Sequence, residues 1–134
     1  MSISNFSWLY QDEPRETDQG IRDFSSYEFW IHFPDVHVNR IEYPYSDVAL
    51  RTGTEILKEN TWHKLEISTF DGTLEFWIDG DLFVIYQDPE PLPPGGIRIG
   101  VGMEGEPENH TKVYFDDFVV CGLQAPFKSI LNQQ

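Results

Sequence analysis

The segment from residue 61 to residue 88 limits the possible folds more than any other part of the chain. Apolar and polar residues alternate in its first two runs, the third run is mostly apolar, and an Asp-Gly dipeptide separates each run from the next. A period of two is typical of half-buried strands, and Asp-Gly readily supplies the positive φ of a tight hairpin turn. The segment therefore predicts three antiparallel strands in meander order. The runs and the two dipeptides are 61–69, Asp71-Gly72, 74–79, Asp79-Gly80 and 82–86.

Shorter runs of the same character lie on both sides of this meander. They are rich in Val, Ile, Phe and Tyr, which suit a pleated, half-buried surface. The four prolines between Gln87 and Gly96 predict a loop there, because proline lacks the N–H donor that a ladder needs. The polar residues 11–26 predict a long loop, a helical turn is expected only near 127–131, and no internal repeat is evident. The expected strands are 6–10 at a sheet edge, 27–33, 36–43, 47–50, 97–101 and 112–121.

Antiparallel sheets need a second layer to bury their apolar faces, so eight or nine short strands predict a sandwich or a barrel. The 134 residues are enough for one core, and we expect one domain over 1–134. Trp62 is assigned to the core or its edge. The other residues expected inside are Leu65, Ile67, Leu74, Phe76, Ile78, Ile99, Phe115 and Val119.

The charge of the chain excludes some partners. Asp and Glu number 23 against 9 Lys and Arg, a net charge of −14, which repels phosphate backbones and anionic membrane surfaces. No window approaches the roughly 18 apolar residues of a membrane span. The one cysteine cannot form an internal disulfide, and the first eight residues lack the pattern of a signal peptide. A cytoplasmic protein and a piece of a secreted parent both fit these observations.

Residues 60–121 carry a resemblance to a known superfamily. They read NTWHKLEISTFDGTLEFWIDGDLFVIYQDPEPLPPGGIRIG and, later, VYFDDFVV. This pattern resembles the C-terminal half of laminin G-like and concanavalin A-like domains, whereas the N-terminal half of the chain fits only loosely. The resemblance implies an all-β, two-sheet antiparallel jelly-roll sandwich, extracellular or at the cell surface as part of a larger protein. Members of this superfamily bind glycans or proteins or act as spacers, and a minority are enzymes.

Aromatic residues outside the expected core are the candidates for ligand contact. Trp77 and Trp30 alternate with core positions, and Tyr43-Pro44-Tyr45 forms an aromatic loop. Sugar rings pack their C–H faces on indoles, and a carboxylate such as that of Glu75 accepts hydrogen bonds from hydroxyls. The alternative is that these tryptophans are simply buried, as tryptophan usually is.

Binding is favoured over catalysis. Glu75 and Asp79 share a strand face, and two carboxylates can act as acid and base. Asp79, however, belongs to an Asp-Gly turn, where Asp is favoured for backbone hydrogen bonding alone. The E-x-D-x-x-E strand motif of related glucanases is absent. A glycoside-active hydrolase of the same fold, and a structural or protein-interaction domain without a small ligand, remain the alternatives.

Asp116 and Asp117 are the candidate metal ligands. The resemblance places a structural metal near this position, and carboxylates are ligands that Ca²⁺ prefers. A segment near Asp12 or Glu13 would supply further oxygens. Adjacent strand residues point to opposite faces, so only one of the pair would ligate through its side chain. The alternative is one outward and one hydrogen-bonded aspartate.

Overall fold

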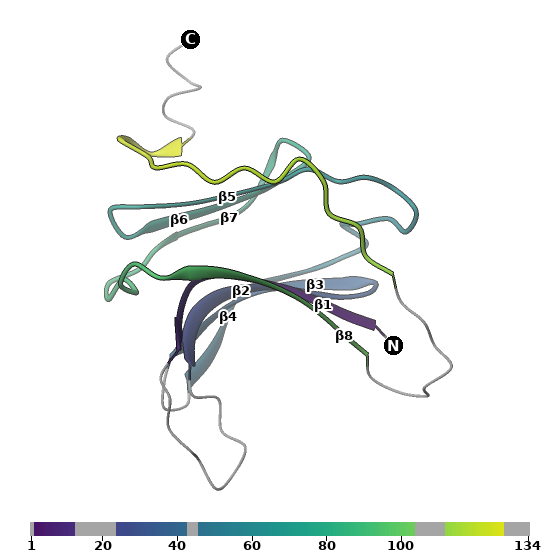
Figure 1. Cartoon of the computed structure of the whole chain (residues 1–134), viewed down its shortest axis with the longest axis horizontal. Helices are drawn as coiled ribbons and strands as arrows, with labels where there is room; N and C mark the ends of the chain where they lie inside the picture. The colour runs from purple at the N-terminus through teal and green to yellow at the C-terminus, as the bar shows by residue number, and fades with distance from the viewer. Residues whose placement is uncertain (1, 13–23, 43–45, 104–111, 128–134) are drawn as a thin grey trace, which may run out of the picture. The chain divides into compact units, whose positions relative to one another are not determined.

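The computed structural model describes residues 2–12, 24–42, 46–103 and 112–127, and its strands form two sheets (Figure 1). Every ladder between these strands is antiparallel. The all-β prediction is therefore confirmed, while the jelly-roll sandwich remains a prediction. The strands are β1 (Ser2–Asp12), β2 (Phe24–His32), β3 (Asp35–Glu42), β4 (Ser46–Thr54), β5 (Leu65–Phe70), β6 (Thr73–Ile78), β7 (Asp81–Gln87) and β8 (Gly96–Met103).

The chain divides into two compact units, and each unit contains one sheet. Unit 1 comprises Met1–Asn60 and Leu92–Val113, and unit 2 comprises Thr61–Pro91 and Tyr114–Gln134. The sheet of unit 1 has the order β4-β3-β2-β1-β8, and that of unit 2 has the order β5-β6-β7. Neither unit is a continuous stretch of chain.

The first strand occupies the interior of the unit 1 sheet. We expected residues 6–10 to form an edge strand, but β1 pairs with β2 on one side and with β8 on the other. This prediction was wrong because the partner on the second side, β8, lies about 90 residues away in sequence, and local patterns carry no signal of such pairing. Register shifts in β1 and β3 accompany the bend of this sheet in Figure 1.

The apolar face of the unit 1 sheet follows the predicted alternation. Tyr27 and Phe29 of β2 and Val36 and Val38 of β3 are each 2% exposed or less. Phe29 lies directly opposite Val38, so the pair shares this face. Ile99, which we expected inside, is 39% exposed, because β8 forms the sheet edge and has a neighbouring strand on one side only.

The three-stranded meander of unit 2 forms as predicted. Both Asp-Gly turns have positive φ at each residue, 48° and 77° for Asp71-Gly72 and 51° and 85° for Asp79-Gly80. These are the values that match the twist of a two-residue hairpin. The predicted core residues of β6 are buried, and the Phe76 ring meets the Phe83 ring edge-to-face at 6.2 Å between centroids. The buried residues are Leu74, Phe76 and Ile78, while Leu65 and Ile67 of β5 are half-buried.

The strand predicted over 112–121 is not formed. The described part of this segment is irregular, and Phe115 and Val119, which we expected inside, are 47% and 82% exposed. Asp117 donates its backbone N–H to Asp116 Oδ1 at 2.8 Å and has a φ of 52°. A local side-chain bond of this kind removes a donor from any ladder, and the left-handed conformation turns the chain out of a strand. From Tyr114 onward the segment belongs to unit 2.

Trp62 is also placed differently from the prediction. Its side chain is 69% exposed, because β5 begins at Leu65 and not at residue 61. Residues 11–12 and 24–26, at the ends of the expected loop at 11–26, belong to β1 and β2. The rest of that loop and most of the helical turn at 127–131 lie outside the described residues. Across the described ranges, the structure contains no helix that is long and apolar enough to span a membrane.

Candidate functional site

One tetrapeptide occurs twice, once in each sheet. Glu28-Phe29-Trp30-Ile31 lies in β2, and Glu75-Phe76-Trp77-Ile78 lies in β6. In both strands the Phe is buried, with exposures of 1% and 0%. Successive strand residues point to opposite faces, so the Glu and the Trp of each copy share the face that the Phe does not occupy. The sequence analysis missed this repeat, although its signal is four identical residues.

The first copy fixes an indole ring with a buried carboxylate. The Trp30 Nε1–H donates to the Glu28 carboxylate, and Glu28 is 2% exposed whereas Trp30 is partly exposed. The strand register places Asn39 directly opposite Glu28 and His37 directly opposite Trp30. His37 Nδ1 lies 3.0 Å from the hydroxyl of Thr52 on β4. We call these five residues, Glu28, Trp30, His37, Asn39 and Thr52, the Trp30 face.

Among the five residues of the Trp30 face, Asn39 has a side-chain oxygen that accepts no hydrogen bond. Its side chain is 9% exposed, and its Oδ1 has no hydrogen-bond partner. Buried polar atoms without a partner are rare in native proteins, because losing water without gaining a bond costs about 1–3 kcal/mol. The Trp30 face therefore holds an acceptor beside a carboxylate and an indole.

The second copy repeats this arrangement on the unit 2 sheet. The Trp77 Nε1–H donates to Glu75 Oε1 at 3.3 Å, and Glu75 is 6% exposed. Ser68 lies directly opposite Glu75, is 5% exposed, and has a hydroxyl without a hydrogen-bond partner. Glu66 lies opposite Trp77, and Ile85 of β7 lies opposite Glu75. We call Glu66, Ser68, Glu75, Trp77 and Ile85 the Trp77 face.

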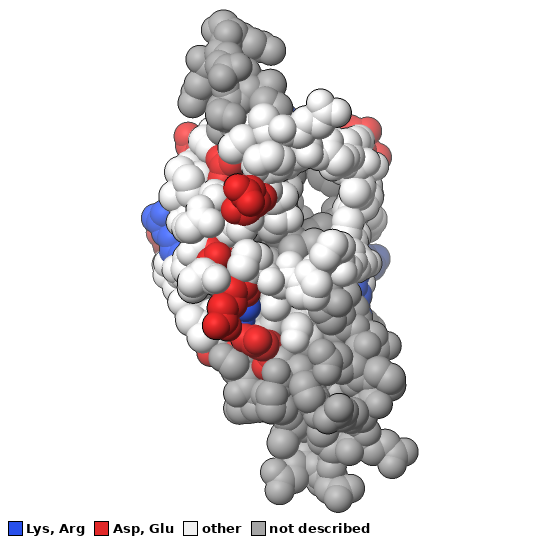
Figure 2. All heavy atoms as spheres, turned by 90° about the vertical axis from the view of Figure 1, so that its left-hand side faces the viewer, with Lys and Arg blue, Asp and Glu red and all other residues white. Residues whose placement is uncertain are grey.

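The electrostatics of both faces favour neutral ligands that carry hydrogen-bond donors. Carboxylate oxygens accept hydrogen bonds from N–H and O–H groups, and the net charge of −14 repels anions. Acidic side chains also outnumber basic ones on the side of the molecule shown in Figure 2. The indole N–H of each Trp donates to its Glu, and each Trp is partly exposed.

Asp79 does not join Glu75 as a catalytic partner. Its Oδ2 lies 2.6 Å from His63 Nδ1, and its Oδ1 accepts the backbone N–H of Lys64 at 2.8 Å. The hydrogen bond from His63 and then the one from Lys64 lower the pKa of the Asp79 carboxyl. Asp79 therefore ties the hairpin end to the segment before β5, as expected for a turn aspartate.

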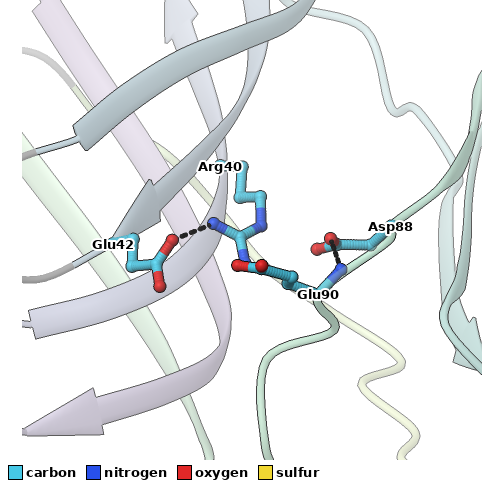
Figure 3. Close-up of polar contacts among 4 residues, drawn as sticks. All are labelled: Arg40, Glu42, Asp88 and Glu90. Atoms are coloured by element: carbon cyan, nitrogen blue, oxygen red, sulfur yellow. Dashed lines mark hydrogen bonds and ion pairs between the residues drawn. The ribbon is translucent and has the colours of Figure 1, made fainter.

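Two further acidic contacts are local and structural (Figure 3). In unit 1, Arg40 donates to Glu42 Oε2 at 2.6 Å, and the Arg40 side chain is 11% exposed. In unit 2, the Glu90 N–H donates to Asp88 Oδ1 at 2.8 Å just after β7 ends. The Asp88 contact closes a turn of the kind that aspartate favours. Neither contact involves the repeated tetrapeptide.

The structure separates the candidates that the sequence suggested. Trp77 and Glu75 are hydrogen-bonded neighbours on one face, and Trp30 lies on the sheet of the other unit. Tyr43 and Tyr45 lie outside the described residues. Asp116 and Asp117 lie on an irregular segment, and within the described ranges no three His, Cys, Asp or Glu residues are grouped to hold a metal ion. A calcium site that draws on Asp116 or Asp117 stays a prediction.

Comparison with protein-family models and with curated protein sequences found no match.

Proposed function

We propose that this chain is a non-catalytic carbohydrate-binding module of the concanavalin A-like fold and that the Trp30 face is its primary site. One observation carries the proposal: a partly exposed indole is held in place by a buried carboxylate two residues before it. Ligand contact then costs little side-chain entropy, since the ring is already oriented. This pre-organisation matches the needs of stacking against a sugar ring.

The neighbours of the ring supply polar recognition. His37 and Thr52 offer a nitrogen and a hydroxyl beside the ring. Small-molecule sites typically combine an apolar contact surface with a few placed polar groups. A pyranose supplies the complementary pair, with C–H groups on its faces and hydroxyls on its edge.

The ligand class follows from charge and ring shape. A net charge of −14 and the acceptor-only Glu28 disfavour uronates and sulfated glycans. Stacking is best with pyranoses whose hydroxyls are all equatorial, because their faces then expose only C–H groups. We therefore propose neutral glucose-based oligosaccharides as ligands. A glycan ligand also agrees with a place outside the cell or at its surface, in a larger protein.

Titration of two tryptophan variants tests this proposal. One aromatic contact contributes on the order of 1–3 kcal/mol, so we expect micromolar to millimolar dissociation constants for β-linked glucose hexasaccharides. Trp30→Ala should weaken binding by about tenfold or more, the equivalent of about 1.4 kcal/mol. The matched control is Trp62→Ala, because Trp62 is 69% exposed and lies outside the Trp30 face. This control should bind like the wild type.

Three results would contradict the proposal. Wild-type protein that binds no neutral hexasaccharide on a glycan array removes the carbohydrate function. Unchanged binding by a folded Trp30→Ala variant removes the Trp30 face as its site. Turnover of chromogenic glycosides by the wild type would replace a binding module with a hydrolase.

A further inference from the structure

We propose that the Trp77 face is a second carbohydrate site, so that one chain binds two neutral oligosaccharides. The inference rests on the proposed function and extends it from one site to two. Its basis is the tetrapeptide of β2 and β6, which produces the same local geometry in each sheet. The hydrogen bond from the Trp to the Glu is copied together with the sequence.

Three features recur around the two copies. Each Glu is nearly buried, at 2% and 6% exposure, and each Trp is partly exposed. Each Trp Nε1–H donates to the carboxylate two residues earlier. Each Glu faces a polar side chain on the adjacent strand that has an unpartnered oxygen, Asn39 in one copy and Ser68 in the other.

A purely structural role explains these features less well. Burying a carboxylate costs several kcal/mol unless its bonds are well satisfied, and a neutral side chain could hold an indole at lower cost. A buried Ser hydroxyl without a partner adds to that cost at the Trp77 face. Proteins accept such costs mainly where function requires them. Carbohydrate stacking accounts for a partly exposed ring that is held in one orientation.

The two faces differ in the groups that surround the ring. His37 lies opposite Trp30, whereas Glu66 lies opposite Trp77 and has a side chain that is 18% exposed. Ile85, across from Glu75, is 62% exposed and widens the apolar surface. Lys64 Nζ lies 3.7 Å from Glu66 Oε2 and offsets its charge, so the second site differs from the first mainly in its larger apolar surface. We expect it to accept neutral glucose oligosaccharides, as the Trp30 face does.

Indole N–H resonances allow both sites to be observed in the intact wild-type chain. The sequence contains four tryptophans, each with one side-chain N–H, and single Trp→Phe variants assign the four ¹⁵N–¹H signals. We would titrate the chain separately with cellohexaose and with laminarihexaose. We expect the Trp30 and Trp77 signals to shift and to saturate, while the signal of the exposed Trp62 stays in place. Calorimetry should give a stoichiometry of two for the wild type and of one for Trp77→Ala.

The possible outcomes separate this inference from the proposed function. Saturable shifts of Trp30 alone, with a stoichiometry of one, overturn the second site and leave the first. Shifts of Trp77 alone overturn the two-site inference together with the Trp30 assignment. No saturable shift with either hexasaccharide overturns both. If Trp77→Ala does not fold, the wild-type shifts decide the question.

Discussion

The carboxylate of Asp79, in the turn between β6 and β7, is held by two hydrogen bonds. Asp79 adopts a φ of 51° and has a hydrogen bond to each carboxylate oxygen, from His63 and from Lys64. Both bonds favour the ionised form and so lower the pKa of this carboxyl from its ordinary value of 3.8. A depressed pKa in the folded state stabilises the fold above the unfolded pKa. That stability is lost as the pH falls through the folded value.

Asp79→Asn should therefore lower the free energy of unfolding at about pH 7, and the gap to the wild type should close as the pH falls below the ordinary carboxyl pKa of 3.8. Asparagine tolerates positive φ as aspartate does, so the turn itself is preserved. The Asp79 side chain is 46% exposed, so solvent screening keeps the effect modest. Urea midpoints across this pH range measure it. Asp71→Asn, at the matching position of the other hairpin, is the control, and a constant gap at all pH values would contradict the argument.

Burial separates two apolar residues of unit 2 that the sequence analysis placed together. Phe76 is 0% exposed and contacts the Phe83 ring, whereas Val119 is 82% exposed. Phe76→Ala should cost about 3–5 kcal/mol of unfolding free energy. Val119→Ala should change it by no more than about 0.5 kcal/mol. Chemical denaturation of both variants gives the comparison, and similar losses would restore Val119 to the core.

At the scale of elements, the two hairpins of the meander provide a matched pair of glycines. Gly72 and Gly80 both adopt positive φ, so alanine strains the backbone at either position by about 1–2 kcal/mol. A Cβ at Gly72 would also lie 3.0 Å from Pro91 Cγ and 3.3 Å from Asp88 O, whereas a Cβ at Gly80 meets nothing within 4 Å. The β6–β7 hairpin has room that the β5–β6 hairpin lacks.

Gly72→Ala should therefore lower the melting temperature more than Gly80→Ala does. Backbone strain is common to both variants. The difference between their melting temperatures therefore reports the contact of the new Cβ with the loop after β7. Thermal unfolding followed by circular dichroism measures it. Equal shifts would mean that the loop containing Pro91 moves aside without cost.

The elements that the sequence predicted correctly are those specified by neighbouring residues. The Asp-Gly turns and the alternation around them are local, and the β5–β7 meander followed from them. The strand predicted over 112–121 had suitable side chains but forms no ladder, because pairing depends on a distant partner and Asp117 turns the backbone. Strand propensity describes how side chains fit a sheet and does not supply the partner strand.

The candidate site was predictable only in part for the same reason. Trp30, Trp77 and Glu75 were found from alternation, which depends on one strand alone. Asn39 and Ser68 enter through the register with a neighbouring strand, and a shift of one residue would turn each to the other face. Glu28 could have been found by comparing β2 with β6, since the two copies are identical over four residues.

For the whole molecule, net charge should select among glycans before any contact forms. A charge of −14 produces a field that extends about 30 Å at 10 mM salt and only a few ångströms at 0.5 M. We expect polygalacturonate to bind at least about tenfold more weakly than a neutral glucan at low salt, with the gap narrowing as salt rises. Affinity electrophoresis at the two salt concentrations measures this. A preference for the acidic polymer would contradict both the charge argument and the proposed ligand class.

The pairing of β1 with β8 also affects the order in which the sheet can form on the ribosome. Ser2 pairs with Met103, so one edge of β1 has no partner until the chain has grown by about 90 residues beyond Asp12. At about 5–20 residues per second, that interval lasts about 5–20 seconds. An unpaired strand edge can pair with another chain, so nascent copies on one polysome are exposed to mispairing throughout it. The speed of synthesis over residues 13–103 should therefore affect the soluble yield of this protein. We expect its effect on the yield to be larger than the effect of the free energy of unfolding.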